Sequence, residues 1–251
     1  FTSTGQMIDK LVEVEYKGAK DYLMDLEVRQ NRADCYGVLG LARELAAYYN
    51  ISFKFPENKL NDLQFQGDDL DIEVRAKESV KRLMALKFSN LNISDSPDWL
   101  REYLELYGIN SINNLVDITN YVMLETGLPS HVFDTDLVGD RLIWEINSLF
   151  SEFITLNGNK IDIAGISDLL TITNEKKLLS LSFIGGSEDA VSKSTKNIIL
   201  EMGLYDGGLV RRNGRRLSVI TEAGQRLEKY IDPEMIPIAF SMLVEMIQEH
   251  C

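Results

Sequence analysis

The densest group of side chains that could do chemistry lies between residues 112 and 134. This segment interleaves amides, carboxylates and hydroxyls with apolar residues, and it contains His131, one of two histidines in the chain. Asp117, Thr119 and Asn120 recur too closely to share one helix face apart from the apolar residues around them. Buried polar groups need hydrogen-bonding partners. If the segment is buried, some of these side chains must meet a partner or a ligand.

Other polar residues and a glycine pair could complete such a site. Glu201 ends the apolar run 198–200, where a carboxylate is costly unless it is paired or faces a cavity. Gly185 and Gly186 follow another apolar run and either free backbone N–H groups for a ligand or form a tight turn. Together with Thr221 and the first segment, they supply donors and acceptors but no strong nucleophile and base pair. Such a set suits the positioning of a water molecule against an activated ester better than covalent catalysis.

Structural roles are also open for these groups. Glu201 could form a salt bridge with an arginine of Arg211-Arg212-Asn213-Gly214-Arg215-Arg216, the only dense basic patch in the sequence. The patch could bind a phosphate or an acidic partner, or it could neutralise nearby acids in a solvated loop. His131 could be a structural histidine whose hydrogen bonds are satisfied within the fold.

Composition excludes several classes of protein. The 251 residues are 45% hydrophobic and carry a formal net charge of −13, which predicts a globular protein without a broad surface for gripping DNA or RNA. No apolar run approaches the ~18 residues of a membrane span, and the first residues do not resemble a secretion signal. We therefore expect a cytoplasmic protein with no membrane or DNA partner. Cys35 and Cys251 show no disulfide framework and, with the histidines, no metal-ligand spacing, so we predict no metal site.

Hydrophobic periodicity predicts the elements that position these residues. A strand over 22–28 and a helix over 34–49 form a first unit, and the polar, acidic stretch 56–69 indicates a linker or domain boundary. A helix over 112–125 is followed by a loop through Pro129 and His131. The other expected strands are 70–75, 84–93, 142–146, 153–156, 160–164, 169–173, 179–184 and 197–202, and the other expected helices start after Ser96 as N-cap, after Asp206, and after Asp232 as cap.

These elements predict an α+β fold. A mixed β-sheet core is wrapped by helices and preceded by a small strand–helix N-terminal unit. We place the domain boundary between residues 69 and 70, so that 1–69 is the end of a small N-terminal domain plus a linker and 70–251 is a second domain.

A series of motifs over residues 20–245 occurs in the order of one known family. The motifs are Asn31-Arg32-Ala33-Asp34-Cys35, Val38-Leu39-Gly40-Leu41-Ala42-Arg43-Glu44, Ser96-Pro97-Asp98-Trp99-Leu100, Val116-Asp117-Ile118-Thr119-Asn120-Tyr121-Val122-Met123-Leu124-Glu125, His131 with Phe133-Asp134, Gly185-Gly186, Leu200-Glu201, Arg215-Arg216-Leu217, Thr221-Glu222-Ala223 and Asp232-Pro233. In these motifs the chain resembles the β subunit of bacterial phenylalanyl-tRNA synthetase.

The resemblance implies that residues 70–251 are the editing domain, which in that family hydrolyses Tyr mischarged onto tRNA(Phe). It implies that Glu201 recognises the tyrosine hydroxyl. It also implies an α subunit that holds the synthetic site, a heterotetramer, tRNA(Phe) as a partner, and ATP and Mg used by the complete synthetase but no cofactor in this fragment. The implied catalytic residues are His131, Thr119, Asn120 and Thr221, and the implied substrate-binding residues are Glu201, Gly185, Gly186 and Ala223.

Departures from the family pattern leave alternatives open. Asn110 stands where the family usually has arginine, Leu128 and Ser130 replace its usual residues around Pro129, and Phe183 replaces a smaller valine or isoleucine. These changes would fit a structural module of the heterotetramer whose editing pocket has become inactive. A free-standing amino-acid-binding or trans-editing protein is a third hypothesis. The charge of −13 predicts weak, salt-sensitive tRNA binding by the chain alone.

Overall fold

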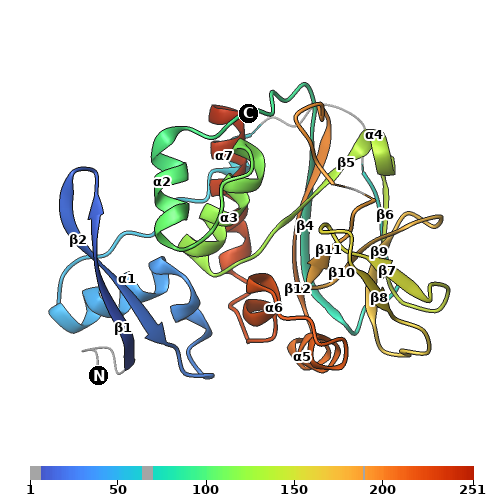
Figure 1. Ribbon diagram of the computed structural model, residues 1–251, viewed down its shortest axis with the longest axis horizontal. Helices are drawn as coiled ribbons and strands as arrows, with labels where there is room; N and C mark the ends of the chain where they lie inside the picture. Colours follow the sequence, from blue (N-terminus) through green and yellow to red (C-terminus); the bar gives the residue numbers. More distant parts are fainter. Residues whose placement is uncertain (1–6, 64–69, 189) are drawn as a thin grey trace.

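A hairpin and a helix form the N-terminal part of the computed structural model, which describes residues 7–63, 70–188 and 190–251 (Figure 1). The elements are β1 (Met7–Tyr16), β2 (Ala19–Glu27), the 3₁₀ helix η1 (Ala33–Tyr36) and α1 (Val38–Tyr49). β1 and β2 pair antiparallel through a tight turn at Lys17 and Gly18, both of which have positive φ. The expected strand and helix are present as β2 and α1, and β1 is a further strand that was not predicted from the sequence.

A three-stranded antiparallel sheet carries Glu201. Its central strand is β12 (Ile198–Tyr205), with β4 (Val80–Phe88) on one side and β5 (His131–Asp134) on the other. All eight residues of β12 are buried. β4 pairs with β12 along residues 198–205 and β5 along residues 198–201, so the first half of β12 has backbone partners on both sides.

A second sheet has five strands in the order β11-β10-β9-β6-β3. β3 and β6 are parallel and the remaining pairs are antiparallel, so the predicted mixed sheet is confirmed. A separate hairpin, β7–β8, reaches this sheet through a bridge between Thr155 and Gly186. The bounds are β3 (Asp71–Val74), β6 (Arg141–Ile146), β7 (Glu152–Ile154), β8 (Lys160–Asp162), β9 (Leu170–Thr173), β10 (Leu178–Leu181) and β11 (Ile184–Gly185).

Helices separate the N-terminal hairpin from the sheets (Figure 1). α3 packs against α1, α2 and α7, and α7 also contacts β4 and β12. One continuous cluster of buried apolar side chains runs from these helices into both sheets, which confirms the α+β class. The bounds are α2 (Asp98–Leu106), α3 (Asn114–Thr126), α4 (Thr135–Val138), α5 (Gly207–Arg216), α6 (Glu222–Leu227) and α7 (Met235–His250).

Two predicted helix caps are wrong. α2 begins at Asp98, and Ser96 does not cap it, because the Ser96 hydroxyl donates to the carboxylate of Asp117 at 2.5 Å. α7 begins at Met235. Asp232 instead accepts a hydrogen bond from the backbone N–H of Glu234 in the preceding turn, so the predicted start of α7 lies too early in the chain.

Some predicted strand limits are also wrong. His131 begins β5 and does not lie in a loop. The expected strand 179–184 is two strands, β10 and β11, which reverse direction at residues 182–183, and Gly185 ends β11. β4 covers residues 80–88, earlier than the expected 84–93.

The first part of the predicted linker packs against α7. The Lys59 backbone N–H donates to the Ser241 hydroxyl at 2.9 Å, and the Lys59 ammonium pairs with Glu245 at 2.7 Å. A short 3₁₀ helix, η2 (Leu60–Asp62), follows. Residues 64–69 lie outside the described residues, so the domain boundary at 69/70 stays a prediction. None of the helices in the described ranges has the length and apolar character needed to cross a membrane.

Candidate functional site

Glu201 is positioned by the centre of the three-stranded sheet. Because side chains alternate along a strand, Glu201, Gly203 and Tyr205 share one face of β12. Glu201 lies opposite His131 of β5 and opposite Ala85 of β4. Glu201 is only 3% exposed. The sheet register therefore places a buried carboxylate beside a histidine that is 70 positions away in the sequence.

A tyrosine of the same strand holds the carboxylate of Glu201. The Tyr205 hydroxyl donates to Oε1 of Glu201 at 2.7 Å, and the Trp144 indole N–H donates to the Tyr205 oxygen at 3.2 Å. Gly203 leaves room for this contact, because a Cβ atom there would lie 2.5 Å from Oε1 and 2.6 Å from the Tyr205 oxygen. The three side chains form a buried chain of hydrogen bonds.

The alternative salt bridge between Glu201 and the arginine patch is wrong. Arg212 and Arg216 instead pair with Asp168 at 3.3 and 2.7 Å. Arg211 and Arg215 lie on a different face of α5, where they line a groove. Two arginines of the patch therefore form ion pairs with Asp168, and the other two line a groove without an ion pair to a described residue.

Burial controls the charge of Glu201. It raises the pKa of the carboxyl group from 4.5 to about 7, while the hydrogen bond from Tyr205 and the positive potential of His131 act in the opposite direction. Burial also raises the pKa of Tyr205 well above its usual value, so this hydroxyl remains a donor. A carboxyl group with a pKa near neutrality is typical of functional sites.

The His131 side chain lies against β11 of the five-stranded sheet. Its ring meets the ring of Phe133 edge-on, with centroids 4.5 Å apart. A Cβ atom at Gly185 would lie 2.6 Å from Cε1 of His131. Glycine at position 185 is therefore what allows β11 to approach the imidazole. At Gly186, a Cβ atom would collide with the backbone oxygen of Leu179, so this glycine serves the close packing of the chain on itself.

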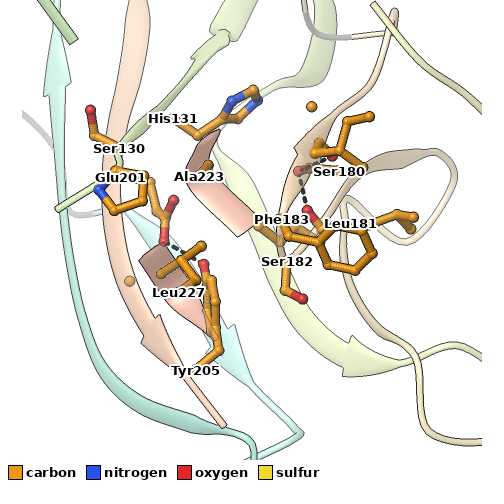
Figure 2. Close-up of a pocket in the computed structure, with 15 residues that line it drawn as sticks. Ser130, His131, Ser180, Leu181, Ser182, Phe183, Glu201, Tyr205, Ala223 and Leu227 are labelled. Atoms are coloured by element: carbon orange, nitrogen blue, oxygen red, sulfur yellow. Dashed lines mark hydrogen bonds between the residues drawn. The ribbon is translucent and has the colours of Figure 1, made fainter. Parts of the chain in front are cut away.

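A small cavity lies between the two sheets. Its volume is about 70 Å³, and its walls come from residues 129–131, β9, the β10–β11 hairpin, β12 and α6. Figure 2 shows Glu201 and Tyr205 on one side, Phe183 on the other, and His131 and Ala223 between them. Phe183 is 3% exposed and lines the cavity, so a residue bulkier than the usual valine or isoleucine occupies part of its wall.

The structure brings half of the predicted site residues together. Glu201, His131, Gly185 and Ala223 line the cavity, whereas Gly186 lies beside the wall. Thr221 caps α6 by accepting from the Gly224 N–H at 2.8 Å, and its hydroxyl donates to the Phe183 carbonyl at 2.8 Å. It therefore positions one wall without lining the cavity.

Two predicted catalytic residues lie on α3, away from the cavity wall. Thr119 and Asn120 are half-buried and do not line the cavity. The Thr119 hydroxyl donates to the Val116 carbonyl of its own helix at 2.7 Å. Their catalytic roles stay predictions.

Several residues of the cavity wall were not among the predicted site residues. The predicted strand 197–202 ended too early, because β12 continues to Tyr205. With the full strand, the period of two places Tyr205 on the same face as Glu201. Ser130 and Ser182 also line the cavity, and their buried hydroxyls form no hydrogen bond with the described residues. Ser130 stood out only as a departure from the family pattern, and no local signal marks Ser182, because their burial depends on contacts between distant segments.

The family model of the B3/4 domain matches residues 79–251. This range contains every residue of the cavity wall. The chain belongs to the B3/4 domain family. Among the described residues of this B3/4 domain, no cluster of His, Cys, Asp or Glu could hold a metal ion.

Curated relatives of this B3/4 domain protein include phenylalanine–tRNA ligase β subunits. The phenylalanine–tRNA ligase β subunit of Clostridium acetobutylicum is 36% identical over 242 residues, which cover 94% of this chain and 30% of that protein. The β subunit of Carboxydothermus hydrogenoformans is also 36% identical, over 98% of this chain and 30% of that protein. The predicted resemblance is confirmed, and the chain spans about 30% of the length of these relatives.

One solved structure is similar over a large share of the chain. It is a crystal structure of an N-terminal fragment of the phenylalanyl-tRNA synthetase β-subunit from Pyrococcus horikoshii, with a TM-score of 0.41 and 16% identity, over 80% of this chain and 60% of that chain. This similarity is too low to support conclusions about the site.

Proposed function

We propose that the cavity hydrolyses the ester of tyrosine mischarged onto tRNA(Phe), as the editing site of a phenylalanine–tRNA ligase β subunit. The observation that carries this proposal is the buried carboxylate of Glu201, which faces the cavity from the centre of a sheet. A buried acceptor of this kind favours the binding of a ligand that has a hydroxyl donor and disfavours one that lacks it, because an unpaired buried acceptor costs free energy.

Selection between tyrosine and phenylalanine would follow from this carboxylate. Oε1 of Glu201 accepts from Tyr205, and Figure 2 shows the second oxygen directed away from Tyr205. We assign that second oxygen, Oε2, to the hydroxyl of a tyrosyl substrate. A phenylalanyl ester would leave Oε2 without a donor in a buried site, and hydrogen-bonding sites reject such analogues by factors of roughly 10⁴–10⁵.

Hydrolysis requires a water molecule near the ester carbonyl. The cavity wall contains serines but no thiol and no lysine. The Ser180 hydroxyl donates to backbone carbonyls, and those of Ser130 and Ser182 have no hydrogen-bond partner among the described residues, so no serine is paired with a base and we assign no covalent nucleophile. His131 is the group on the wall best suited to orient the water and accept its proton, with a ribose hydroxyl of the substrate as an aid. The bond that breaks is the ester C–O bond, and the ribose oxygen that leaves takes up a proton.

The same proposal includes the partners of the complete enzyme. We propose that the chain works in the cytoplasm within a heterotetramer with α subunits, that it binds the aminoacylated end of tRNA(Phe), and that ATP and Mg serve the synthetic reaction of the α subunit. The names of the relatives support this assignment.

Deacylation of Tyr-tRNA(Phe) by the complete ligase tests the proposal, with Phe-tRNA(Phe) as the second substrate. We expect selective hydrolysis of the tyrosyl ester, and loss of that selectivity in Glu201→Ala and Glu201→Gln. The Gln variant is the matched control for volume, since it keeps the shape of the side chain and removes the charge. Background hydrolysis by an enzyme that still charges phenylalanine would refute the proposal.

A second candidate function is a structural module whose cavity no longer hydrolyses esters. The observation that favours it is the cavity volume of about 70 Å³, which is smaller than the roughly 150 Å³ of an apolar cavity that binds benzene. Under this hypothesis, the domain serves assembly and tRNA positioning. Under the first hypothesis, the wall formed by Phe183 must move when the substrate enters.

A further inference from the structure

A groove of about 630 Å³ lies beside the cavity, and Phe183 lines both hollows. The groove is formed by α5, α6 and the loop between them. The backbone N–H of Val219 donates to the Gly214 carbonyl at 2.9 Å, which closes the end of α5 and folds the loop back over it. Thr221 and Gly224 join the groove to the wall of the cavity.

The four arginines of the basic patch lie on two different faces of α5. Residues four apart share one face of a helix, so Arg211 and Arg215 form one pair and Arg212 and Arg216 form another. The second pair binds Asp168. The first pair lines the groove, and no carboxylate among the described residues pairs with it. Two uncompensated cations on one wall are notable in a chain with a net charge of −13.

The rest of the groove does not neutralise these cations. Glu228 is the acidic residue of the lining, and it pairs with Lys229 at 2.6 Å. Ser218 and Gln225 add neutral polar groups to the lining. Ile220 is 83% exposed and offers an apolar surface that the face of a base could cover. The groove therefore combines positive charge, neutral polar groups and some apolar surface.

We propose that this groove binds the phosphates of a single-stranded RNA end, with Arg211 and Arg215 contacting the backbone just before the terminal aminoacyl ester. Guanidinium groups form paired, charge-assisted hydrogen bonds with phosphate oxygens. An RNA end held there places its last ribose near Phe183 and Thr221, at the border of the cavity. The inference rests on the proposed function, because it takes the cavity as the site of the ester.

Two double variants of the complete ligase test the groove. Arg211→Gln with Arg215→Gln removes the groove pair, and Arg212→Gln with Arg216→Gln removes the same charge from the same helix. The substrates are Tyr-tRNA(Phe) and tyrosyl-adenosine, an ester without phosphates. We expect the groove variant to lower kcat/KM for Tyr-tRNA(Phe) by roughly tenfold or more at low salt, and to leave tyrosyl-adenosine hydrolysis unchanged.

The salt dependence gives a second readout that a structural defect would not produce. Loss of two phosphate contacts should make the slope of log kcat/KM against log salt concentration shallower by roughly 1–2. The control variant should keep the slope of the unmodified enzyme. Equal losses in both double variants, or no loss in the groove variant, would overturn the inference.

Binding of a 5′-phosphorylated CCA trinucleotide separates this inference from the proposed function. If the enzyme hydrolyses neither ester but binds the trinucleotide, and the groove variant abolishes that binding, the groove inference stands and the proposed hydrolysis fails. If the enzyme hydrolyses the tyrosyl ester and both double variants bind the trinucleotide equally, the groove inference fails and the proposed hydrolysis stands.

Discussion

Tyr205 and Glu201 share one face of β12, and the Tyr205 hydroxyl donates to Oε1 of Glu201 at 2.7 Å. The carboxylate that we assign to reading a tyrosine hydroxyl is therefore already bound on one oxygen by a tyrosine of the chain. Tyr205 is fixed in turn by the indole N–H of Trp144, which is fully buried. Because the indole N–H of Trp144 fixes the Tyr205 hydroxyl, that hydroxyl sets the orientation of the Glu201 carboxylate and stabilises its charge.

Tyr205→Phe should weaken both the fold and the selectivity. The variant leaves Oε1 of Glu201 and the indole N–H of Trp144 without a buried partner, so we expect the free energy of unfolding to fall by about 1–3 kcal/mol. The ratio of hydrolysis rates for tyrosyl and phenylalanyl esters should fall as well. Urea unfolding and the two deacylation assays measure these effects.

Tyr103→Phe is the matched control, because the Tyr103 hydroxyl also donates to a half-buried carboxylate, that of Glu125, at 2.7 Å. Neither residue lines the cavity. The control should lower stability and leave the ester selectivity unchanged. If Tyr205→Phe behaves like the control, Tyr205 has only a structural role.

Glu201 should make the stability depend on pH between about 4.5 and 7. Burial raises its pKa from 4.5 to about 7 in the folded chain, so the folded state binds the proton more tightly than the unfolded state. The stabilisation is fully present below pH 4.5 and is lost as the pH rises through 7. A shift of this size corresponds to about 3 kcal/mol.

The difference in unfolding free energy between the chain and Glu201→Gln isolates this effect, because glutamine does not titrate. Urea unfolding at pH 5 and at pH 8 should show the unmodified chain losing stability relative to the variant at the higher pH. A difference that stays constant across this range would show that the carboxyl group has an ordinary pKa.

Gly185→Ala should displace His131. The new Cβ atom would lie 2.6 Å from Cε1 of the imidazole, so the ring must rotate or β11 must move away from β5. We expect a loss of tyrosyl ester hydrolysis that exceeds the loss of stability. Gly208→Ala on α5 is the control, because its Cβ atom would meet only the side chains of Asp206 and Arg212 at 3.2 and 3.4 Å. Unchanged hydrolysis in Gly185→Ala would show that the reaction does not depend on the position of His131.

Local patterns in the sequence predicted much of the fold. The helix expected over 112–125 is α3, from Asn114 to Thr126, because apolar spacing and the capping side chain of Asn113 are local signals. The polar residues within it required partners, and Asp117 has them: it is fully buried and accepts from the hydroxyls of Ser96 and Ser111. Its role is structural.

Long-range pairing determines what the sequence could not predict. His131 meets Glu201 only because β5 pairs with β12, and no local pattern gives that strand order. The two faces of the arginine patch follow from the helical period, but the choice between an ion pair and an open groove depends on Asp168, which lies in a distant turn. Only some of the site residues expected from local motifs therefore lie together at the cavity.

Phe183→Val distinguishes an editing cavity from an inactive structural module. Phe183 forms a wall of the cavity, and the smaller side chain would enlarge the space for a substrate. We expect the free energy of unfolding to fall by about 1–3 kcal/mol, as for other large-to-small substitutions in a core. If the cavity edits, kcat/KM for the tyrosyl ester should rise, because less movement is needed to admit the ring.

Phe240→Val on α7 is the control, since Phe240 is also buried but lies outside the cavity wall, and it should lower stability without raising hydrolysis. Hydrolysis that remains at background in Phe183→Val, in an enzyme that still charges phenylalanine, would support the structural module.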